Sequence, residues 1–315
     1  MIHNEYNPII MNIIQNIEKV MVGKRTVAEL SIAALLAEGH VLLEDVPGVG
    51  KTMMVRALAK SVGAKFKRIQ FTPDLLPSDV TGVSVYNPKE MEFEFRPGPI
   101  MGNIILADEI NRTSPKTQAA LLEGMEEKSI TVDGITYPLE KPFFVMATQN
   151  PIEYEGTYPL PEAQLDRFLL KMKMGYPTPD EEMEVLSRVR LSNPIEDLQP
   201  VITLDELRDL QKKVKRTIVD DSLKRYIVDL ANATRNDRDV YLGASPRGSI
   251  ALMKAAQAYA FMKGRDFCLP DDIQYLAPYV FSHRIILKSE AKYRGLTEEE
   301  IVRRALHAVP VPVKR

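Results

Sequence analysis

The chain has a single cysteine, Cys268, among its 315 residues, and this scarcity excludes two kinds of site. One thiol cannot form a disulfide within the chain, and a cysteine-rich metal centre is equally excluded. The four histidines, at positions 3, 40, 283 and 307, have no spacing typical of metal ligands. We therefore expect Cys268 to be a small core residue and His40, which precedes a buried strand, to be structural.

An excess of one charge and a long apolar run are also missing. The 41 lysines and arginines nearly balance the 43 aspartates and glutamates, which gives a formal net charge of −2. This balance argues against a strongly basic nucleic-acid-binding protein. Residues 1–19 lack the continuous apolar segment of a signal peptide, and no stretch approaches the roughly 20 apolar residues that span a bilayer. We therefore expect a cytoplasmic protein that does not insert into membranes.

Short apolar runs alternate with helical patterns in the first half of the chain. Before these runs, apolar residues recur at helical spacing through the first 37 residues. Helices that separate short buried strands are typical of a parallel sheet covered by helices on both faces. We therefore predict an α/β fold with parallel strands at residues 41–43, 66–71, 104–107, 143–147 and 168–172.

Two hairpins are predicted to interrupt this α/β pattern. In the first, near residues 82–98, Met91, Phe93 and Phe95 alternate with glutamates at strand periodicity. In the second, near residues 128–140, the pair Asp133-Gly134 is a strong two-residue turn signal between apolar residues. The sequence leaves open whether these hairpins line a central pore or only pack against the core.

The pattern changes after residues 176–179, and prolines at positions 177, 179, 194 and 200 mark the boundary region. From residue 180 onward almost every segment has helical periodicity. We therefore predict two domains, an α/β domain at residues 1–190 and an all-helical domain at residues 191–315.

A glycine-rich loop between the first predicted strand and a helix carries the strongest functional signal. Small residues let backbone N–H groups surround a phosphate, and the N-terminus of the following helix adds a favourable dipole. Lys51 is expected to reach the β- and γ-phosphates, and the Thr52 hydroxyl to bind Mg²⁺. Asp45 stands where such loops usually have glycine, so its side chain must point away from the phosphates. The predicted nucleotide-binding residues are Pro47, Gly48, Val49, Gly50, Lys51, Thr52 and Met53.

Two other predicted strands end in polar residues that suit hydrolysis. Residues 104–107 run into Asp108 and Glu109, which we expect to hold the Mg²⁺ shell and to polarise the attacking water, respectively. Residues 143–147 lead to Asn150, a candidate for contact with the γ-phosphate or that water. Taken singly, these residues also fit an ordinary acidic strand end and a loop-capping asparagine. These residues follow the phosphate loop in the sequence and stand at the ends of two separate buried strands. This arrangement favours ATP hydrolysis.

At these positions the sequence resembles the MoxR branch of the AAA+ ATPases, and the resemblance covers essentially the whole chain. The motifs that carry it lie at residues 42–52, 68–79, 108–112, 147–151 and 160–168. The resemblance implies an αβα AAA+ core with a five-stranded parallel sheet, followed by a helical lid. The two hairpins correspond to insertions of the group that contains MoxR, Mg-chelatase and MCM proteins, and Asp45 also occurs within the MoxR branch.

The same resemblance implies roles for single residues. Asn150 is similar to the first sensor, Arg167 to the arginine finger that acts on a neighbour's ATP, and Arg247 to the second sensor. Whether Arg247 acts on its own or a neighbour's nucleotide stays open. Taken alone, Arg167 also suits a surface ion pair and Arg247 a solvated side chain at a helix start. The resemblance also implies adenine contact for Val22 and Gly23 and restraint of Glu109 for Gln70, while Arg112 is either a further subunit contact or an exposed loop arginine.

The resemblance implies a MoxR-type ATPase that uses ATP and Mg²⁺ in a ring, a hexamer, to remodel, mature or activate other proteins. Such proteins typically work with von Willebrand factor A domain partners. We expect no effector domain after the lid, which fits an ATPase motor coupled to a separate adaptor protein. Three other functions remain open: a motor that remodels nucleic acid, a Mg-chelatase-like ATPase subunit, and a nucleotide-dependent scaffold without catalysis. The intact Asp108 and Glu109 argue against the scaffold.

Overall fold

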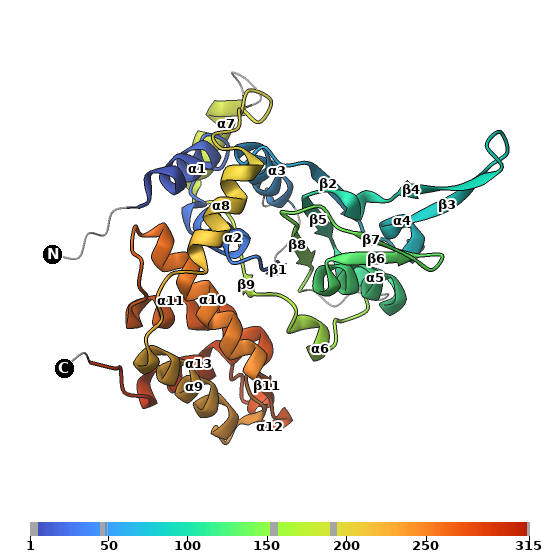
Figure 1. Ribbon diagram of the computed structural model, residues 1–315. Coiled ribbons are helices and arrows are strands. Elements are labelled where there is room, and N and C mark those ends of the chain that lie inside the picture. Colours follow the sequence, from blue (N-terminus) through green and yellow to red (C-terminus); the bar gives the residue numbers. More distant parts are fainter. Residues whose placement is uncertain (1–5, 45–47, 49, 152–156, 190–193, 314–315) are drawn as a thin grey trace.

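The computed structural model describes residues 6–44, 48, 50–151, 157–189 and 194–313. Asp45, Pro47 and Val49 of the predicted phosphate loop lie outside the described residues. Figure 1 shows a sheet that separates the projecting hairpins from a large group of helices to which the C-terminal part of the chain belongs.

The central sheet is parallel and has five strands in the order β2-β5-β8-β1-β9. Their positions confirm the five strands that the apolar runs predict, with small differences at the ends. The strands are β1 (Val41–Glu44), β2 (Phe66–Gln70), β5 (Ile104–Asp108), β8 (Phe144–Gln149) and β9 (Leu170–Met172). In the register, β1 lies between β8 and β9, with Val41 opposite Met146 on one side and Leu170 on the other.

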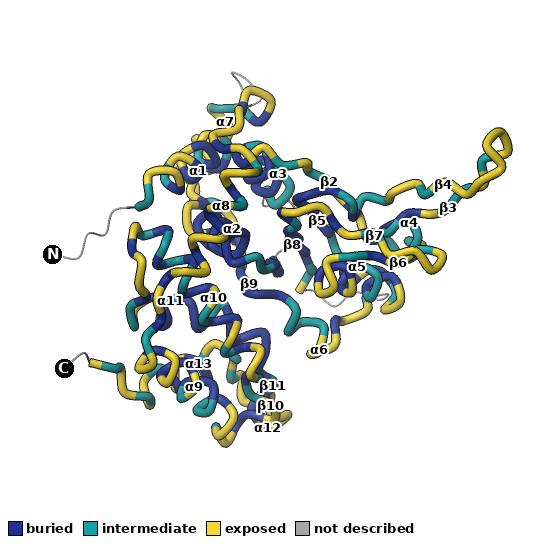
Figure 2. Tube along the Cα trace, in the orientation of Figure 1, coloured by how far each residue is buried: buried dark blue, intermediate teal, exposed yellow. Residues whose placement is uncertain are grey.

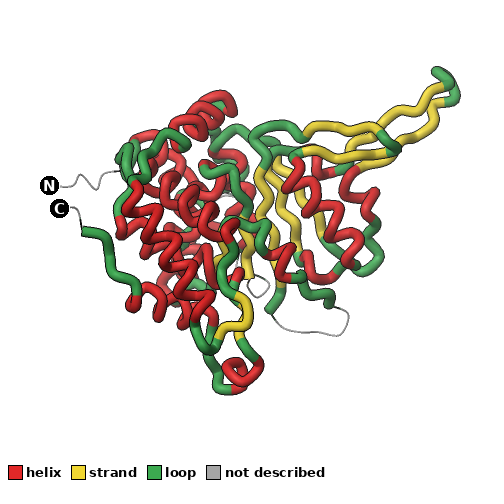
Figure 3. Tube along the Cα trace, turned by 60° about the horizontal axis from the view of Figure 1, so that its bottom comes forward, coloured by secondary structure: helices red, strands yellow, loops and turns green. Residues whose placement is uncertain are grey.

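Apolar side chains of β1, β5 and β8 alternate between two hydrophobic layers. In β1, Val41 and Leu43 belong to one buried cluster while Leu42 belongs to the other. The first cluster includes helices α1 (Pro8–Glu18), α2 (Arg25–Leu36) and α3 (Lys51–Ser61), and the second includes α4 (Pro77–Thr81) and α5 (Pro115–Glu127). The sheet therefore has helices on both faces, as Figure 3 shows, and the αβα prediction is confirmed.

Both predicted hairpins are present. The first consists of β3 (Gly82–Asn87) and β4 (Glu92–Pro97), and the second of β6 (Ser129–Val132) and β7 (Ile135–Pro138). The first hairpin projects well beyond the core, and Figure 2 shows its tip exposed. At its base, Gly82 has φ of +105°, and a Cβ there would lie 2.4 Å from the Arg96 carbonyl oxygen, so only glycine fits. The hairpins touch where Phe95 stacks on Tyr137, with ring centroids 4.0 Å apart.

The rest of the chain is largely helical, which confirms the predicted helical lid. Several helices begin at a capping side chain, for example Thr203, whose hydroxyl accepts a hydrogen bond from the Glu206 N–H at 3.2 Å. A small antiparallel sheet of β10 (Val240–Leu242) and β11 (Ile286–Leu287) also lies in this region, and the sequence did not predict it. The longer helices are α7 (Pro179–Val189), α8 (Leu204–Val214), α9 (Asp221–Asn236), α10 (Pro246–Met262), α11 (Pro270–Phe281) and α13 (Glu298–Ala308). Short helices occur in both regions. They are η1 (Pro99–Met101), η2 (Ile110–Arg112) and α6 (Glu162–Leu165) in the α/β region, and η3 (Ser282–Arg284) and α12 (Ser289–Tyr293) in the helical region.

The helical region packs directly on the α/β region. The first hydrophobic cluster continues from strands β1 and β9 through α2 into α8, α10 and α11, with α10 against α2 and α11 against β9. Residues 190 and 191 lie outside the described part of the chain, so the domain division at 190/191 stays a prediction. This packing fixes the position of α10, which carries Arg247, relative to the sheet.

Candidate nucleotide-binding and hydrolysis site

Because the five strands are parallel, their carboxyl ends lie along one edge of the sheet. The phosphate loop follows β1 at this edge, and Asp108 and Glu109 stand at the end of β5. Asn150 follows β8, which lies between β1 and β5. The fold therefore brings together residues that the sequence places on three separate strands.

The described part of the phosphate loop has the backbone that an anion site needs. Gly48 and Gly50 have φ of +85° and +91°, in the left-handed region that favours glycine. Gly50 precedes α3, which begins at Lys51. The first N–H groups of a helix have no partner within it, so a helix that begins at Lys51 can direct N–H groups toward phosphate oxygens.

The predicted adenine-contacting segment borders this loop. A Cβ on Gly50 would lie 3.4 Å from Met21 Cε, and a Cβ on Gly23 would overlap the Glu181 carboxyl group. The buried Lys24 ammonium donates to the carbonyl oxygens of residues 174, 175 and 176 at 3.1 to 3.2 Å. Met21 and Gly23 therefore lie beside Gly50 and Glu181, respectively, and adenine contact by Val22 and Gly23 stays a prediction.

A buried threonine joins the Asp108 carboxylate to the backbone of Glu109. The Thr148 hydroxyl donates to Asp108 Oδ1 at 2.7 Å and accepts from the Glu109 N–H at 2.8 Å. The other Asp108 oxygen accepts from Arg68 Nη2 at 2.7 Å, and the same Arg68 nitrogen donates to Gln70 Oε1 at 2.8 Å. Among the described residues, Gln70 thus contacts Arg68 and not Glu109, which gives no support to its predicted role in restraining Glu109.

Glu109 has an unusual backbone. Its φ and ψ of +55° and +52° lie in the left-handed region, which costs a residue with a Cβ about 1 kcal/mol or more. Its side chain forms an ion pair with Arg112 Nη1 at 3.2 Å. This turn directs Glu109 away from the line of β5, and Arg112 balances its charge.

The backbone of Asn150 is also fixed by an amide side chain. Asn111 Nδ2 donates to the Asn150 carbonyl oxygen at 3.2 Å, and Asn111 Oδ1 accepts from the Asn150 N–H at 3.4 Å. Asn111 lies in η2, directly after Glu109 and Ile110. The predicted sensor and the predicted catalytic base are thus joined through one short segment.

A charged contact lies at the end of β1, just before the phosphate loop. Glu44 Oε2 pairs with Lys171 Nζ at 2.8 Å and accepts from Gln149 Nε2 at 2.8 Å. Burial alone raises the pKa of Glu44, but the Lys171 ammonium and the Gln149 hydrogen bond outweigh it and hold this pKa below its usual value. The contact links the three strands β8, β1 and β9 at the edge where the loop begins.

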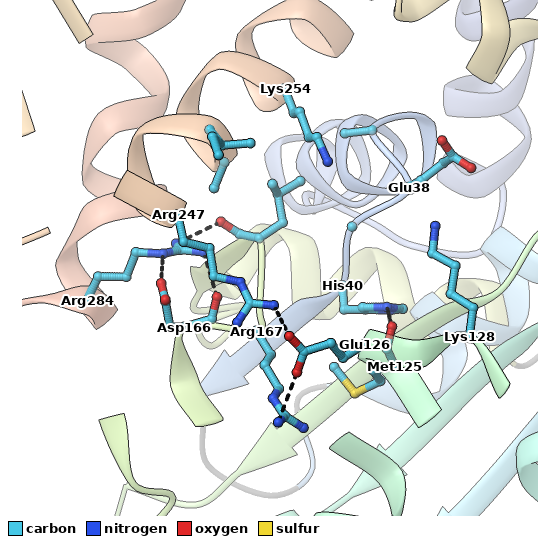
Figure 4. A pocket seen from close by; sticks show the side chains of 15 residues that line it. Glu38, His40, Met125, Glu126, Lys128, Asp166, Arg167, Arg247, Lys254 and Arg284 are labelled. Atoms are coloured by element: carbon cyan, nitrogen blue, oxygen red, sulfur yellow. Dashed lines mark hydrogen bonds and ion pairs between the residues drawn. The ribbon is translucent and has the colours of Figure 1, made fainter. Parts of the chain in front are cut away.

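Arg167 and Arg247 lie at the opposite edge of the sheet. Arg167 precedes β9, Arg247 is in the first turn of α10, and both pair with Glu126 near the end of α5 (Figure 4). They line a pocket of about 190 Å³ together with Gly39 and His40, which precede β1. The four residues of β1 span about 13 Å, so roughly this distance or more separates the two arginines from the phosphate loop of the same subunit.

A buried ion pair holds the Arg167 loop against the helical region. Arg284 Nε donates to Asp166 Oδ1 at 2.7 Å, and its Nη2 donates to the Phe168 carbonyl oxygen at 2.6 Å. Burial lowers the pKa of Arg284 to about 10, and the Asp166 charge opposes this shift. The Ser245 hydroxyl, which caps α10, donates to Asp166 Oδ2 at 3.3 Å. The arginine predicted to act as a finger therefore adjoins a rigid contact with the lid.

Sequence reasoning missed Thr148, Asn111, Glu126 and Arg284. Thr148 follows Ala147, which pairs with Ala107 in the register, so an alignment of the ends of adjacent strands would have placed it beside Asp108. Glu126 contacts an arginine 121 residues away, and no pattern within the sequence signals that contact.

Comparisons with known proteins agree with this geometry. The profile of the ATPase family associated with various cellular activities (AAA) matches residues 40–170, and that of the AAA lid domain matches residues 232–305. The crystal structure of a protein of Cytophaga hutchinsonii described as a candidate ATPase is similar, with a TM-score of 0.91 and 41% identity over 97% of this chain and 95% of that one.

Curated proteins with similar sequences identify the family of the chain more narrowly. It is 67% identical to the uncharacterized protein YeaC of Bacillus subtilis, over 99% of this chain and 97% of that protein. It is 42% identical to the chaperone MoxR1 of Mycobacterium tuberculosis, over 94% of this chain and 80% of that protein. The chain belongs to the MoxR family of AAA+ ATPases. It is therefore a nucleotide-binding ATP hydrolase with an AAA+ core and lid. In the described part of this MoxR protein, no helix is long and apolar enough to cross a membrane.

Proposed function

We propose that this MoxR protein is a ring-forming motor, a hexamer, that couples ATP hydrolysis to the remodelling, maturation or activation of partner proteins. The observation that carries this proposal is the separation of two sets of predicted catalytic residues. Lys51, Asp108 and Glu109 lie at the carboxyl edge of the sheet, whereas Arg167 and Arg247 lie at the amino edge. The second set can serve a nucleotide only if a neighbouring subunit presents it.

Within one subunit, residues at the carboxyl edge of the sheet bind the nucleotide and activate the attacking water. We infer that Lys51 binds the β- and γ-phosphates, that Glu109 takes the proton from water, and that Asn150 positions that water or the γ-phosphate. Mg²⁺ fits this edge through the Thr52 hydroxyl and the Asp108 carboxylate, because Mg²⁺ takes few protein oxygens and completes its shell with water and phosphates.

Across the subunit boundary, Arg167 and Arg247 supply positive charge to the neighbour's γ-phosphate as negative charge shifts in the transition state. Such charges, fixed in position before the reaction, are a large contribution to phosphoryl transfer. For Arg247, this placement favours action on the neighbour's nucleotide over its own. We therefore assign both arginines to action in trans.

The β3–β4 hairpin is suited to contact with client proteins. Phe93 and Met91 are 73% and 76% exposed, and Tyr86 packs edge-on against Phe93. Aromatic side chains held rigidly on an exposed strand pair provide contact area at a low entropic cost. We infer that this hairpin engages clients and that it faces the ring pore. The likeness to MoxR proteins further supports von Willebrand factor A domain partners. A cytoplasmic location stays a prediction of the sequence.

Sedimentation velocity with and without ATP tests this function on the Glu109→Gln variant. We expect this variant to keep ATP binding, to lose most turnover and to shift from the 35.6 kDa subunit to a closed ring when ATP is added. The Lys51→Ala variant should lose both ATP binding and the shift. A monomer under every nucleotide condition contradicts the ring, and unchanged turnover in Glu109→Gln removes Glu109 from the role of base.

A further inference from the structure

A single carboxylate holds both of the arginines that face the neighbouring subunit. Glu126 Oε2 pairs with Arg167 Nη2 at 2.9 Å, and Glu126 Oε1 pairs with Arg247 Nη2 at 2.7 Å (Figure 4). Each oxygen serves one guanidinium group. Glu126 therefore joins a loop of the core to the first turn of a lid helix.

The pocket around Glu126 has more cations than anions. Its lining includes three acidic side chains and five cationic ones, namely Lys128, Arg167, Arg247, Lys254 and Arg284. The acidic Asp166 is engaged by the buried Arg284, and Glu38 is paired with Lys215 outside the pocket. Glu126 is thus the anion that the structure provides for Arg167 and Arg247.

The Glu126 contacts are exposed enough to exchange. The side chains of Glu126, Arg247 and Arg167 are 34%, 45% and 22% exposed, in contrast to 2% for Arg284. Ion pairs that water reaches in this way are weak, and another anion can replace one partner. A terminal phosphate carries more negative charge than a carboxylate and has three acceptor oxygens for the two guanidinium groups.

We propose that Glu126 occupies, in the free subunit, the place of the phosphate that Arg167 and Arg247 bind in the ring. This inference rests on the proposed function in that the phosphate belongs to a neighbour's nucleotide. The phosphate displaces Glu126 as the two subunits meet, so Glu126 competes with every phosphate that enters. It is a positioning residue that keeps both arginines paired and raises the phosphate concentration at which they engage.

Binding of inorganic tripolyphosphate to single subunits tests the competition without a ring. The protein carries Lys51→Ala, so that its own phosphate loop is weakened, and affinity is measured by isothermal titration calorimetry. Adding Glu126→Gln should tighten binding about threefold to tenfold, because the two ion pairs of Glu126 are each worth a factor of about two to three and these factors multiply. Glu127→Gln is the matched control, since it removes the same charge from the next residue, for which no ion pair occurs among the described residues.

Three results overturn the inference: no gain in affinity in Glu126→Gln, an equal gain in Glu127→Gln, or a gain that persists when Arg167→Ala is added. The first means that Glu126 does not compete, and the other two mean that only the overall charge changed. These outcomes do not depend on ring formation, so they are distinguishable from failure of the proposed function.

Assembly of the otherwise unaltered chain provides the second readout. Glu126→Gln should form rings at an ATP concentration about threefold to tenfold lower than the wild type, while Glu127→Gln matches the wild type. A higher ATP requirement in Glu126→Gln overturns the inference, because it means that Glu126 holds the arginines in their active position. If the wild type forms no ring at all, the proposed function fails and the tripolyphosphate result alone decides the role of Glu126.

Discussion

The buried guanidinium of Arg284 offers a quantitative test of how the lid is joined to the core. Besides Asp166 and Phe168, it donates to the carbonyl oxygens of Leu169 and Val280. Replacement of Arg284 by methionine keeps an apolar stem of similar length and removes every one of these donors. The Asp166 carboxylate is then left without its main partner in a site where only 21% of the side chain is exposed.

Breaking a buried ion pair by removing one partner typically costs about 3–5 kcal/mol of the free energy of unfolding. Ser245 still donates to Asp166 and water still reaches it, so we expect Arg284→Met to fall near the lower end, about 3 kcal/mol. Arg247→Met is the matched control in the same pocket. Because Arg247 is 45% exposed, its loss should cost about 1 kcal/mol or less.

Urea unfolding followed by circular dichroism measures both variants. We expect one transition, because the first hydrophobic cluster runs through core and lid alike. Arg284→Met should also lower ATP turnover, since Asp166 directly precedes Arg167. A loss below about 1 kcal/mol in Arg284→Met, equal to that of Arg247→Met, refutes the view that this contact joins lid and core.

Three further predictions follow from single contacts. Thr148→Val removes the hydroxyl between Asp108 and the Glu109 N–H. Steady-state assays should show a lower kcat with little change in KM, and urea unfolding should show a loss of about 2 kcal/mol in the free energy of unfolding. Wild-type turnover in this variant contradicts the prediction. Burial lowers the pKa of His40 to about 4, below its value in the unfolded chain. Between these two pKa values the unfolded chain binds more protons than the folded chain, so the free energy of unfolding decreases as pH falls. Urea unfolding should show a loss of about 2 kcal/mol from pH 7.5 to 5 that His40→Asn lacks, and equal pH slopes contradict it. Phe93→Ser should leave ATP turnover and stability nearly unchanged but reduce the clients captured by the Glu109→Gln protein, and undiminished capture contradicts a role in client binding.

Strands β1, β5 and β8 were predictable because they are buried on both faces and almost wholly apolar, whereas the outer strand β2 is largely exposed and mostly polar. The hairpins were predictable from local signals, namely the alternation of Met91, Phe93 and Phe95 with glutamates in the first and the turn pair Asp133-Gly134 in the second. Strands β10 and β11 have only three and two residues, too few to establish a period, and they depend on a pairing between segments more than 40 residues apart. Their formation is a result of lid packing rather than of local sequence.

The same distinction applies to the site. Lys51, Asp108 and Asn150 follow apolar strands directly, so parallel strand direction alone brings them to one edge. Glu126 lies on the exposed face of a helix end, and its importance arises only when α5, the loop before β9 and α10 meet in space. The left-handed backbone of Glu109 could not be predicted either, because it depends on the contacts that surround it.

A subunit-mixing experiment tests most directly the claim that hydrolysis belongs to the assembly. Glu109→Gln keeps ATP binding, ring formation and Arg167 but lacks the base, whereas Arg167→Ala keeps Glu109 and lacks the arginine. Each variant alone should be nearly inactive. In an equal mixture that assembles at random, about a quarter of the subunit boundaries combine an intact Glu109 with an intact Arg167, so ATP turnover should recover to about that fraction of the wild type. A mixture that stays as inactive as its components, although it forms rings, contradicts action of Arg167 on a neighbour's nucleotide.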